Sequence, residues 1–96
     1  MNIYICMENY KQRKEQIEHF IERVVAPKFK FGHHDVFVGK LFNNKTCRVQ
    51  FDDVPEDALF GISQEMKNFF KMMGLSNIQI KIFNEWGQID ITGTEN

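Results

Sequence analysis

Two short runs with a period of two, separated by a turn sequence, constrain the fold of this chain more than any other feature. Val36 and Val38 alternate with Phe37 and Gly39, and the apolar residues of "CRVQF" (47–51) alternate with Arg48 and Gln50, which is typical of strands with one buried face. "FNNK" lies between them, and Asn-Asn tolerates the positive φ angles of a two-residue type I′ turn. A turn at Asn43-Asn44 would pair Val38 with Val49 and place the apolar residues of both strands on one face. The sequence therefore predicts a β-hairpin.

A first helix is predicted over about residues 10–26. Asn9 and Gln12 have the spacing of an N-cap residue and its capping-box partner, and apolar residues then recur at helical spacing. Pro27 ends this pattern, because its ring cannot continue the hydrogen-bond ladder of a helix.

A second helix is predicted within "DVPEDALFGISQEMKNFFKMMG" (53–74). Asp53 and Glu56 have capping-box spacing, Pro55 suits the first turn, and Gly74 suits the position just after the helix. We expect its apolar stripe to be buried, with the methionines filling the core. The stripe consists of Leu59, Ile62, Met66, Phe69 and Met73.

Two further stretches favour strands. "NIYICM" (2–7) is short, apolar and β-branched, which is typical of a buried strand. "NIQIKIFNEWGQIDITG" (77–93) alternates isoleucine with polar residues on both sides of a turn at 84–87, which predicts a second hairpin.

The predicted element order is β-α-β-β-α-β-β in a single α+β domain covering residues 1–96. With right-handed crossovers, this order closes most simply into a ferredoxin-like β-α-β-β-α-β two-layer sandwich with an extra C-terminal edge strand. If residues 2–7 are not a strand, the alternative is a four-stranded α-β-β-α-β-β layer. Both arrangements leave one face of the sheet without helices.

That uncovered face is the predicted functional surface. Since side chains alternate along a strand, burying the isoleucines and valines turns their aromatic and basic neighbours outward. Large aromatic residues and arginine contribute most of the energy in protein interfaces. The residues predicted to bind a partner are Tyr4, Phe37, Leu41, Arg48, Lys81 and Phe83, with Trp86 at the tip of the second hairpin.

We therefore expect a non-enzymatic protein-binding module, a small inhibitor, antitoxin-like or regulatory protein of bacterial or phage type. Ten phenylalanines in 96 residues exceed what so small a domain normally buries, so a homodimer is also compatible with the sequence. Two cysteines, with no signal peptide and no long apolar run, favour a reducing cytoplasmic location without membrane insertion. A disulfide is not expected, because strand alternation would place Cys6 and Cys47 on opposite sides of the sheet.

RNA binding through the same face is the alternative. "IYI" (3–5) and "VQF" (49–51) resemble parts of the two strand motifs by which RNA-recognition-motif domains stack bases. The chain departs from that pattern, because Thr46 and Arg48 stand where stacking aromatic residues are expected. The N-terminal half carries nine Lys/Arg against five Asp/Glu and could contact phosphates, but the overall pI of about 6.3 disfavours strong nucleic-acid binding.

The most chemically suggestive motif is "GHHD" (32–35). Adjacent side chains at the start of a strand diverge, so His33 and His34 should not converge on one ion, and a zinc site needs three or four ligands. No recognisable catalytic motif or cofactor-binding loop is present. The sequence therefore predicts no catalytic, cofactor-binding or metal-binding residues, and the motif is interpreted as the entry into a strand.

Overall fold

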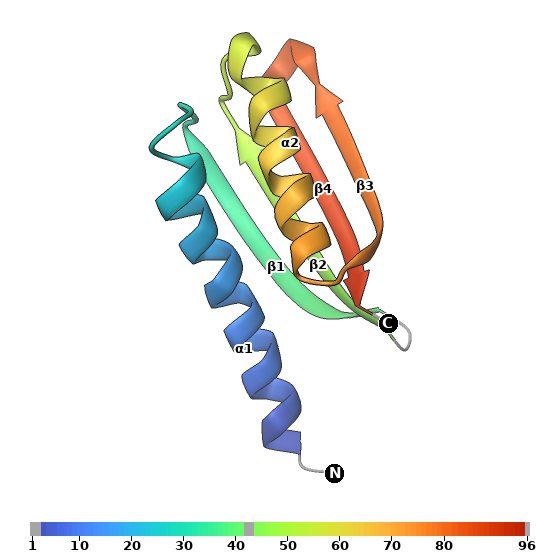
Figure 1. The fold of residues 1–96 in the computed structure, drawn as a ribbon. Coiled ribbons are helices and arrows are strands. Elements are labelled where there is room, and N and C mark those ends of the chain that lie inside the picture. Colours follow the sequence, from blue (N-terminus) through green and yellow to red (C-terminus); the bar gives the residue numbers. More distant parts are fainter. Residues whose placement is uncertain (1–2, 42–43, 96) are drawn as a thin grey trace.

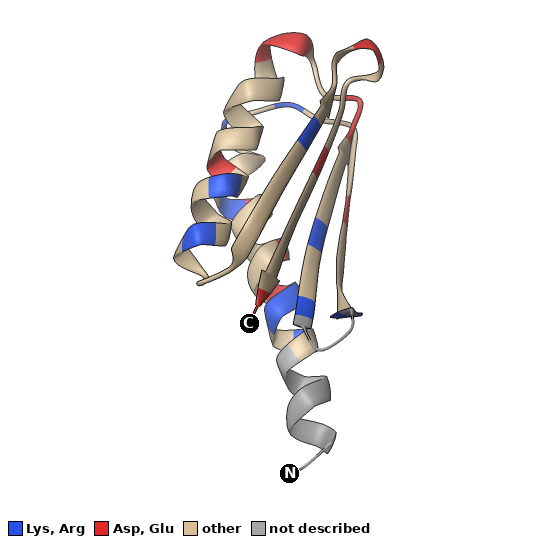
Figure 2. Cartoon of the chain, turned by 90° about the vertical axis from the view of Figure 1, so that its right-hand side faces the viewer, with Lys and Arg blue, Asp and Glu red and all other residues tan. Residues whose placement is uncertain are grey.

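The chain forms two consecutive α-β-β units in the computed structural model. The structure describes the backbone of residues 3–41 and 44–95 and the side chains of residues 10–40 and 45–95. Both helices lie on the same side of a single antiparallel sheet (Figures 1 and 2). The elements are α1 (Ile3–Phe20), extended by a π-helical turn (Ile21–Val25), β1 (His33–Leu41), β2 (Asn44–Asp52), α2 (Glu56–Met72), β3 (Ser76–Phe83), a 3₁₀ turn (Asn84–Trp86) and β4 (Gln88–Glu95).

The predicted strand at residues 2–7 is wrong, since Ile3 to Met7 form the beginning of α1; residue 2 lies outside the described part of the chain. The apolar run continues into the helical segment without an intervening glycine or proline, so the helix extends backward through it. A short apolar run has no periodicity that separates a strand from a buried helix. Tyr4 and Cys6 therefore belong to a helix, and the argument that placed them on the sheet does not hold.

The described chain accordingly has four strands and two helices, an α+β architecture in the alternative order α-β-β-α-β-β. The five-stranded ferredoxin-like arrangement is not formed, because it requires the first strand. No helix in the described residues has the length and apolarity needed to cross a membrane.

The first hairpin forms, but in a different register from the predicted one. Val38 lies opposite Cys47 instead of Val49, and the last pair before the turn is Leu41 with Asn44. Asn44, predicted to lie in the turn, therefore belongs to β2, and residue 43 lies outside the described part of the chain. A shift of two residues keeps every side chain on its predicted face, because side chains along a strand alternate with a period of two.

The second hairpin joins β3 to β4 through the predicted turn, and β4 then pairs with β2, giving the sheet order β1-β2-β4-β3. Val49 lies opposite Ile91 in the central pair, whereas β1 and β3 form the two edges. Gly87 adopts a φ of 60° in the turn and accepts a hydrogen bond from Val54 N–H at 2.9 Å, which ties the turn to the segment before α2.

Helix α2 ends as predicted and begins differently. Gly74 has a φ of 81°, and the amides of Gly74 and Leu75 donate to the carbonyls of Lys71 and Phe70, the two hydrogen bonds of a Schellman motif. At the other end, Pro55 is the N-cap and no side chain caps the helix, so the predicted capping box is not made.

The core lies between the helices and the sheet. Phe51, Val49, Ile89 and Ile91 are fully buried there, and the rings of Phe20 and Phe69 stack at 4.0 Å where the two helices approach each other. Of the isoleucines expected beneath the helices, Ile82 at the end of an edge strand is 41% exposed. The buried part of the α2 stripe is Ala58, Leu59, Ile62, Ser63, Met66 and Phe70, with Phe69 and Met73 partly buried.

Candidate functional site

The candidate site is the face of the sheet that the helices leave open, on the side away from α1 and α2 in Figure 2. Strand alternation and the observed register decide which side chains it carries. We call this surface the open face. Its described residues are His33, Asp35, Phe37 and Gly39 of β1; Thr46, Arg48, Gln50 and Asp52 of β2; Gln88, Asp90, Thr92 and Thr94 of β4; and Gln79, Lys81 and Phe83 of β3.

Large aromatic side chains are exposed at two edges of the open face. Phe37 on β1 is 51% exposed, and Phe83 on β3 is 37% exposed. Trp86, in the turn that follows β3, is 68% exposed and stacks on Phe83 with ring centroids 5.7 Å apart. Because β1 and β3 are separated by three strand spacings, about 14 Å, the aromatic groups are distributed across the whole width of the sheet.

An ion pair occupies the middle of the open face. Arg48 Nε and Nη2 donate to Asp90 Oδ1 and Oδ2, each at 3.0 Å, in a bidentate arrangement. This hydrogen bonding, together with the attraction of the Asp90 charge, raises the pKa of Arg48 above its usual range. Arg48 is paired with Phe37 across the hairpin, but its guanidinium, predicted to be an anchor, is held by Asp90 of β4 on the other side.

One end of the open face is acidic and contains side chains that could hold a metal ion. His33 lies opposite Asp52 across the hairpin, and Asp35 is two residues along β1 on the same face. His33 Nε2 is 3.0 Å from Asp35 Oδ2, and one ligand atom from each of the three residues lies within 4.8 Å of the others. Gln88 on β4 donates a hydrogen bond to Asp52 Oδ1 at 2.7 Å.

His33 and His34 point to opposite sides of the sheet, as the alternation predicts. His34 Nε2 is 2.7 Å from Glu18 Oε2 of α1, and its ring lies against Phe31 and Phe51. The argument that two adjacent histidines do not share an ion is therefore sound. It considered only neighbours in sequence, however, and missed Asp52, which the hairpin brings beside the His33 and Asp35 pair.

The structure brings together five of the seven predicted partner-binding residues. Phe37, Arg48, Lys81 and Phe83 lie on the open face, and Trp86 lies at its edge. Tyr4 belongs to α1 and is removed from the site, whereas Leu41 ends β1 and its side chain lies outside the described residues. The predicted partner-binding set did not include His33, Asp52, Gln88 and Asp90. Strand alternation predicts that Gln88 and Asp90 face outward, and the pairing of His33 with Asp52 across the hairpin is the signal that could have added those two residues.

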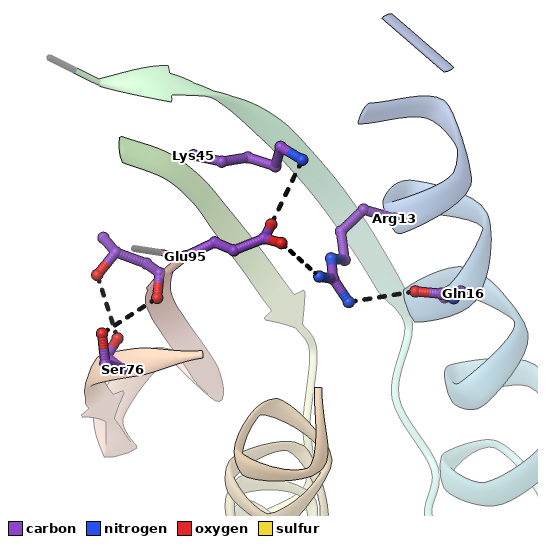
Figure 3. Close-up of polar contacts among 6 residues, drawn as sticks. Arg13, Gln16, Lys45, Ser76 and Glu95 are labelled. Carbon is purple, nitrogen blue, oxygen red and sulfur yellow. Dashed lines mark hydrogen bonds and ion pairs between the residues drawn. The ribbon is translucent and has the colours of Figure 1, made fainter. Parts of the chain in front are cut away.

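A second polar cluster lies on the covered side of the sheet (Figure 3). Glu95 of β4 accepts a hydrogen bond from Arg13 of α1 at 2.9 Å and lies 3.4 Å from Lys45 Nζ of β2. Burial raises the pKa of Glu95, but the two cations outweigh that effect and hold it below its ordinary value. Burial likewise raises the pKa of the neighbouring Cys47 thiol to about 11, so this cysteine stays protonated and poorly reactive at neutral pH. The cluster fastens α1 to the sheet.

A shallow groove of about 870 Å³ runs between α1 and α2. Phe20 and Phe69 line the groove, as does Met72, which is 81% exposed. Most of the remaining lining residues are polar or charged, including Arg13, Glu15 and Arg23. The groove has no convergent set of polar groups such as small-molecule sites use to orient a ligand.

Comparisons of the chain with protein-family models, with curated protein sequences and with solved structures found no match. The geometry of the open face is therefore the basis for assigning a function.

Proposed function

We propose that this chain is a non-enzymatic protein-binding module that docks a partner protein on its open face, in the manner of a small inhibitor, antitoxin or regulatory protein. The observation that carries this proposal is the exposure of Phe37, Phe83 and Trp86 on a sheet face that no described element covers. Aromatic side chains flanking a central arginine are the groups that dominate binding energy in protein interfaces.

The charges of the open face indicate the chemistry of the partner. Arg48 and Lys81 are its cations, and Asp35, Asp52 and Asp90 are its carboxylates. Since Arg48 is neutralised by Asp90, the end of the face that carries Asp35 and Asp52 is left with a negative potential. The partner that fits has apolar pockets for the aromatic rings and a lysine or arginine facing the acidic end.

The same distribution of charges on the open face disfavours RNA as the partner. Phosphates require free cations, but the only arginine of the open face among the described residues is already held by a carboxylate. Stacking of bases also needs neighbouring aromatic side chains on the central strands, where Thr46, Arg48, Gln50 and Asp90 are found.

The test compares capture of binding proteins by the wild-type chain and by the double variant Phe37→Ala/Phe83→Ala. Phe60→Ala is the matched control, because Phe60 is 71% exposed but lies on α2, away from the open face. We expect a partner that is retained by the wild type and the control, and whose purified form binds the double variant at least tenfold more weakly.

Three outcomes would overturn the proposal. One is equal binding of the purified partner to the wild type and the double variant. A second is an affinity that falls steeply with salt and is abolished by nuclease, which would establish nucleic-acid binding instead. The third is concentration-dependent self-association of the wild type that is lost in the double variant, which would assign the open face to a homodimer.

A further inference from the structure

We infer that the acidic end of the open face binds a divalent transition-metal ion through His33, Asp35 and Asp52. This inference goes beyond the proposed function and does not depend on it. It starts from a placement that the fold enforces: His33 and Asp52 are directly opposed in the hairpin, and Asp35 follows His33 on the same face.

The geometry is close to that of a bound ion. Metal–ligand bonds of about 2.0–2.2 Å require ligand atoms separated by roughly 3–3.5 Å around a tetrahedral or octahedral centre. His33 Nε2 and Asp35 Oδ2 are already 3.0 Å apart, and the Asp52 carboxylate is within 4.8 Å of both. Because His33 and Asp35 are 60% and 45% exposed, small rotations of their side chains can close the remaining gap.

The surroundings favour a cation. Among the described residues, neither Asp35 nor Asp52 forms an ion pair with a lysine or arginine, whereas Asp90 and Glu95 on the same sheet do. A bound divalent ion would therefore compensate two carboxylate charges, and it would replace only the contact between His33 Nε2 and Asp35 Oδ2. Its other coordination positions would be filled by water, since the site opens to solvent.

The third ligand is held in place by its own neighbours. Gln88 donates to Asp52 Oδ1 at 2.7 Å, which fixes the carboxylate and leaves Oδ2 available. The Asp52 carbonyl accepts a hydrogen bond from Gly32 N–H at 3.0 Å, so the backbone at the strand end is also fixed. Partners of this kind orient metal ligands and contribute to affinity. Gln88 is thus a positioning residue.

One imidazole nitrogen and two carboxylates form a ligand set that suits Zn²⁺, Co²⁺, Ni²⁺ or Mn²⁺, whereas all-oxygen sites suit Mg²⁺ and Ca²⁺. The probe is Zn²⁺ alone, titrated into the ¹⁵N-labelled full chain by NMR and by calorimetry. We expect one equivalent to bind with shifts centred on residues 33–35, 52 and 88, and excess Mg²⁺ to compete poorly.

The variants use the two adjacent histidines as a matched pair. We expect His33→Ala and Asp52→Asn each to weaken Zn²⁺ binding at least tenfold, and Gln88→Ala to weaken it about tenfold. His34→Ala should bind Zn²⁺ like the wild type, because His34 faces α1. Thermal unfolding of each variant verifies that it is folded.

The inference would be overturned by unchanged Zn²⁺ affinity in His33→Ala, by loss of binding in His34→Ala, or by equal competition from Mg²⁺, which would identify a nonspecific acidic patch. The double variant Phe37→Ala/Phe83→Ala separates this inference from the proposed function. It should retain full Zn²⁺ affinity even where partner binding is lost, and loss of both in that variant would count against an independent metal site.

Discussion

The two faces of the sheet are made by the same four strands, yet they differ in almost every property. On the covered face, Val49, Phe51, Ile89 and Ile91 are excluded from water, and Cys47 is also fully buried. On the open face, two exposed aromatic groups flank a salt bridge and an acidic cluster. Residues one position apart along a strand therefore have different roles. The side chains of the covered face stabilise the fold, and those of the open face are available for binding.

The largest effect on stability is expected when a phenylalanine of the covered face is replaced by alanine. The same replacement on the open face should change stability little. Phe51→Ala is expected to reduce the free energy of unfolding by about 3–5 kcal/mol, because it removes a fully buried ring and leaves a cavity. Phe37→Ala removes a ring that is 51% exposed and should change the free energy by less than about 0.5 kcal/mol. Urea unfolding of both variants measures the contrast, and similar losses in the two would contradict it.

A second test replaces one glycine on each face of the sheet by valine. A Cβ at Gly93 would lie 3.0 Å from Phe70 and 3.3 Å from Leu75, so Gly93→Val should overpack the covered face and cost about 1–3 kcal/mol. A Cβ at Gly39 would meet nothing within 4 Å, so Gly39→Val should be neutral or slightly stabilising in a strand. If Gly39→Val is the more harmful change in urea unfolding, the assignment of the two faces is wrong.

The contrast between the faces was largely predictable, because it depends on alternation and not on the detailed pairing. The hairpin register was wrong by two residues, yet Phe37, Arg48 and the buried valines remained on their predicted faces. An even shift leaves parity unchanged. The C-terminal end of α2 was also predictable, since Gly74 supplies a left-handed residue that the Schellman motif requires.

The N-terminal segment and the acidic cluster were not predicted, for different physical reasons. Residues 3–7 have local strand preference but continue directly into a helical segment, and such a competition is decided by cooperative helix propagation and tertiary packing. The acidic cluster joins side chains from three strands that are up to 55 positions apart in the chain, from His33 to Gln88. Motif searches along the sequence cannot detect such a set, whereas cross-strand pairing can.

The ion pairs Arg13–Glu95 and Arg48–Asp90, one on each side of the sheet, permit a finer comparison, beginning with Glu95 on the covered side. Burial would raise the pKa of Glu95, but Arg13 and Lys45 lower it below the ordinary 4.5. A carboxylate whose pKa is lower in the folded state stabilises the fold above its unfolded pKa, and this stabilisation is lost as the pH falls through the folded pKa. The contribution should be at most about 1 kcal/mol, because the side chain is one third exposed.

We therefore expect Glu95→Gln to be less stable than the wild type at pH 7 and to approach it below pH 4.5, where the wild type loses the contribution of Glu95. Urea unfolding at several pH values measures the difference. Glu85→Gln is the control, because Glu85 is an exposed carboxylate in the turn after β3. A constant difference between Glu95→Gln and the wild type across this range would show that the charge of Glu95 is not responsible.

The smallest effect is expected for the Arg48 and Asp90 pair on the open face. Its bidentate geometry is good, but the arginine side chain is 47% exposed, so water and salt screen the interaction. A double-mutant cycle with Arg48→Ala and Asp90→Ala should give a coupling energy of about 0.5 kcal/mol that decreases at high salt. The same cycle for Arg13 and Glu95, whose side chains are 17% and 33% exposed, should give a larger and less salt-sensitive value. If the open-face pair gave the larger coupling energy, Arg48 would contribute to the stability of the fold as much as to binding. The assignment of stability to the covered face and of binding to the open face would then be wrong for this residue.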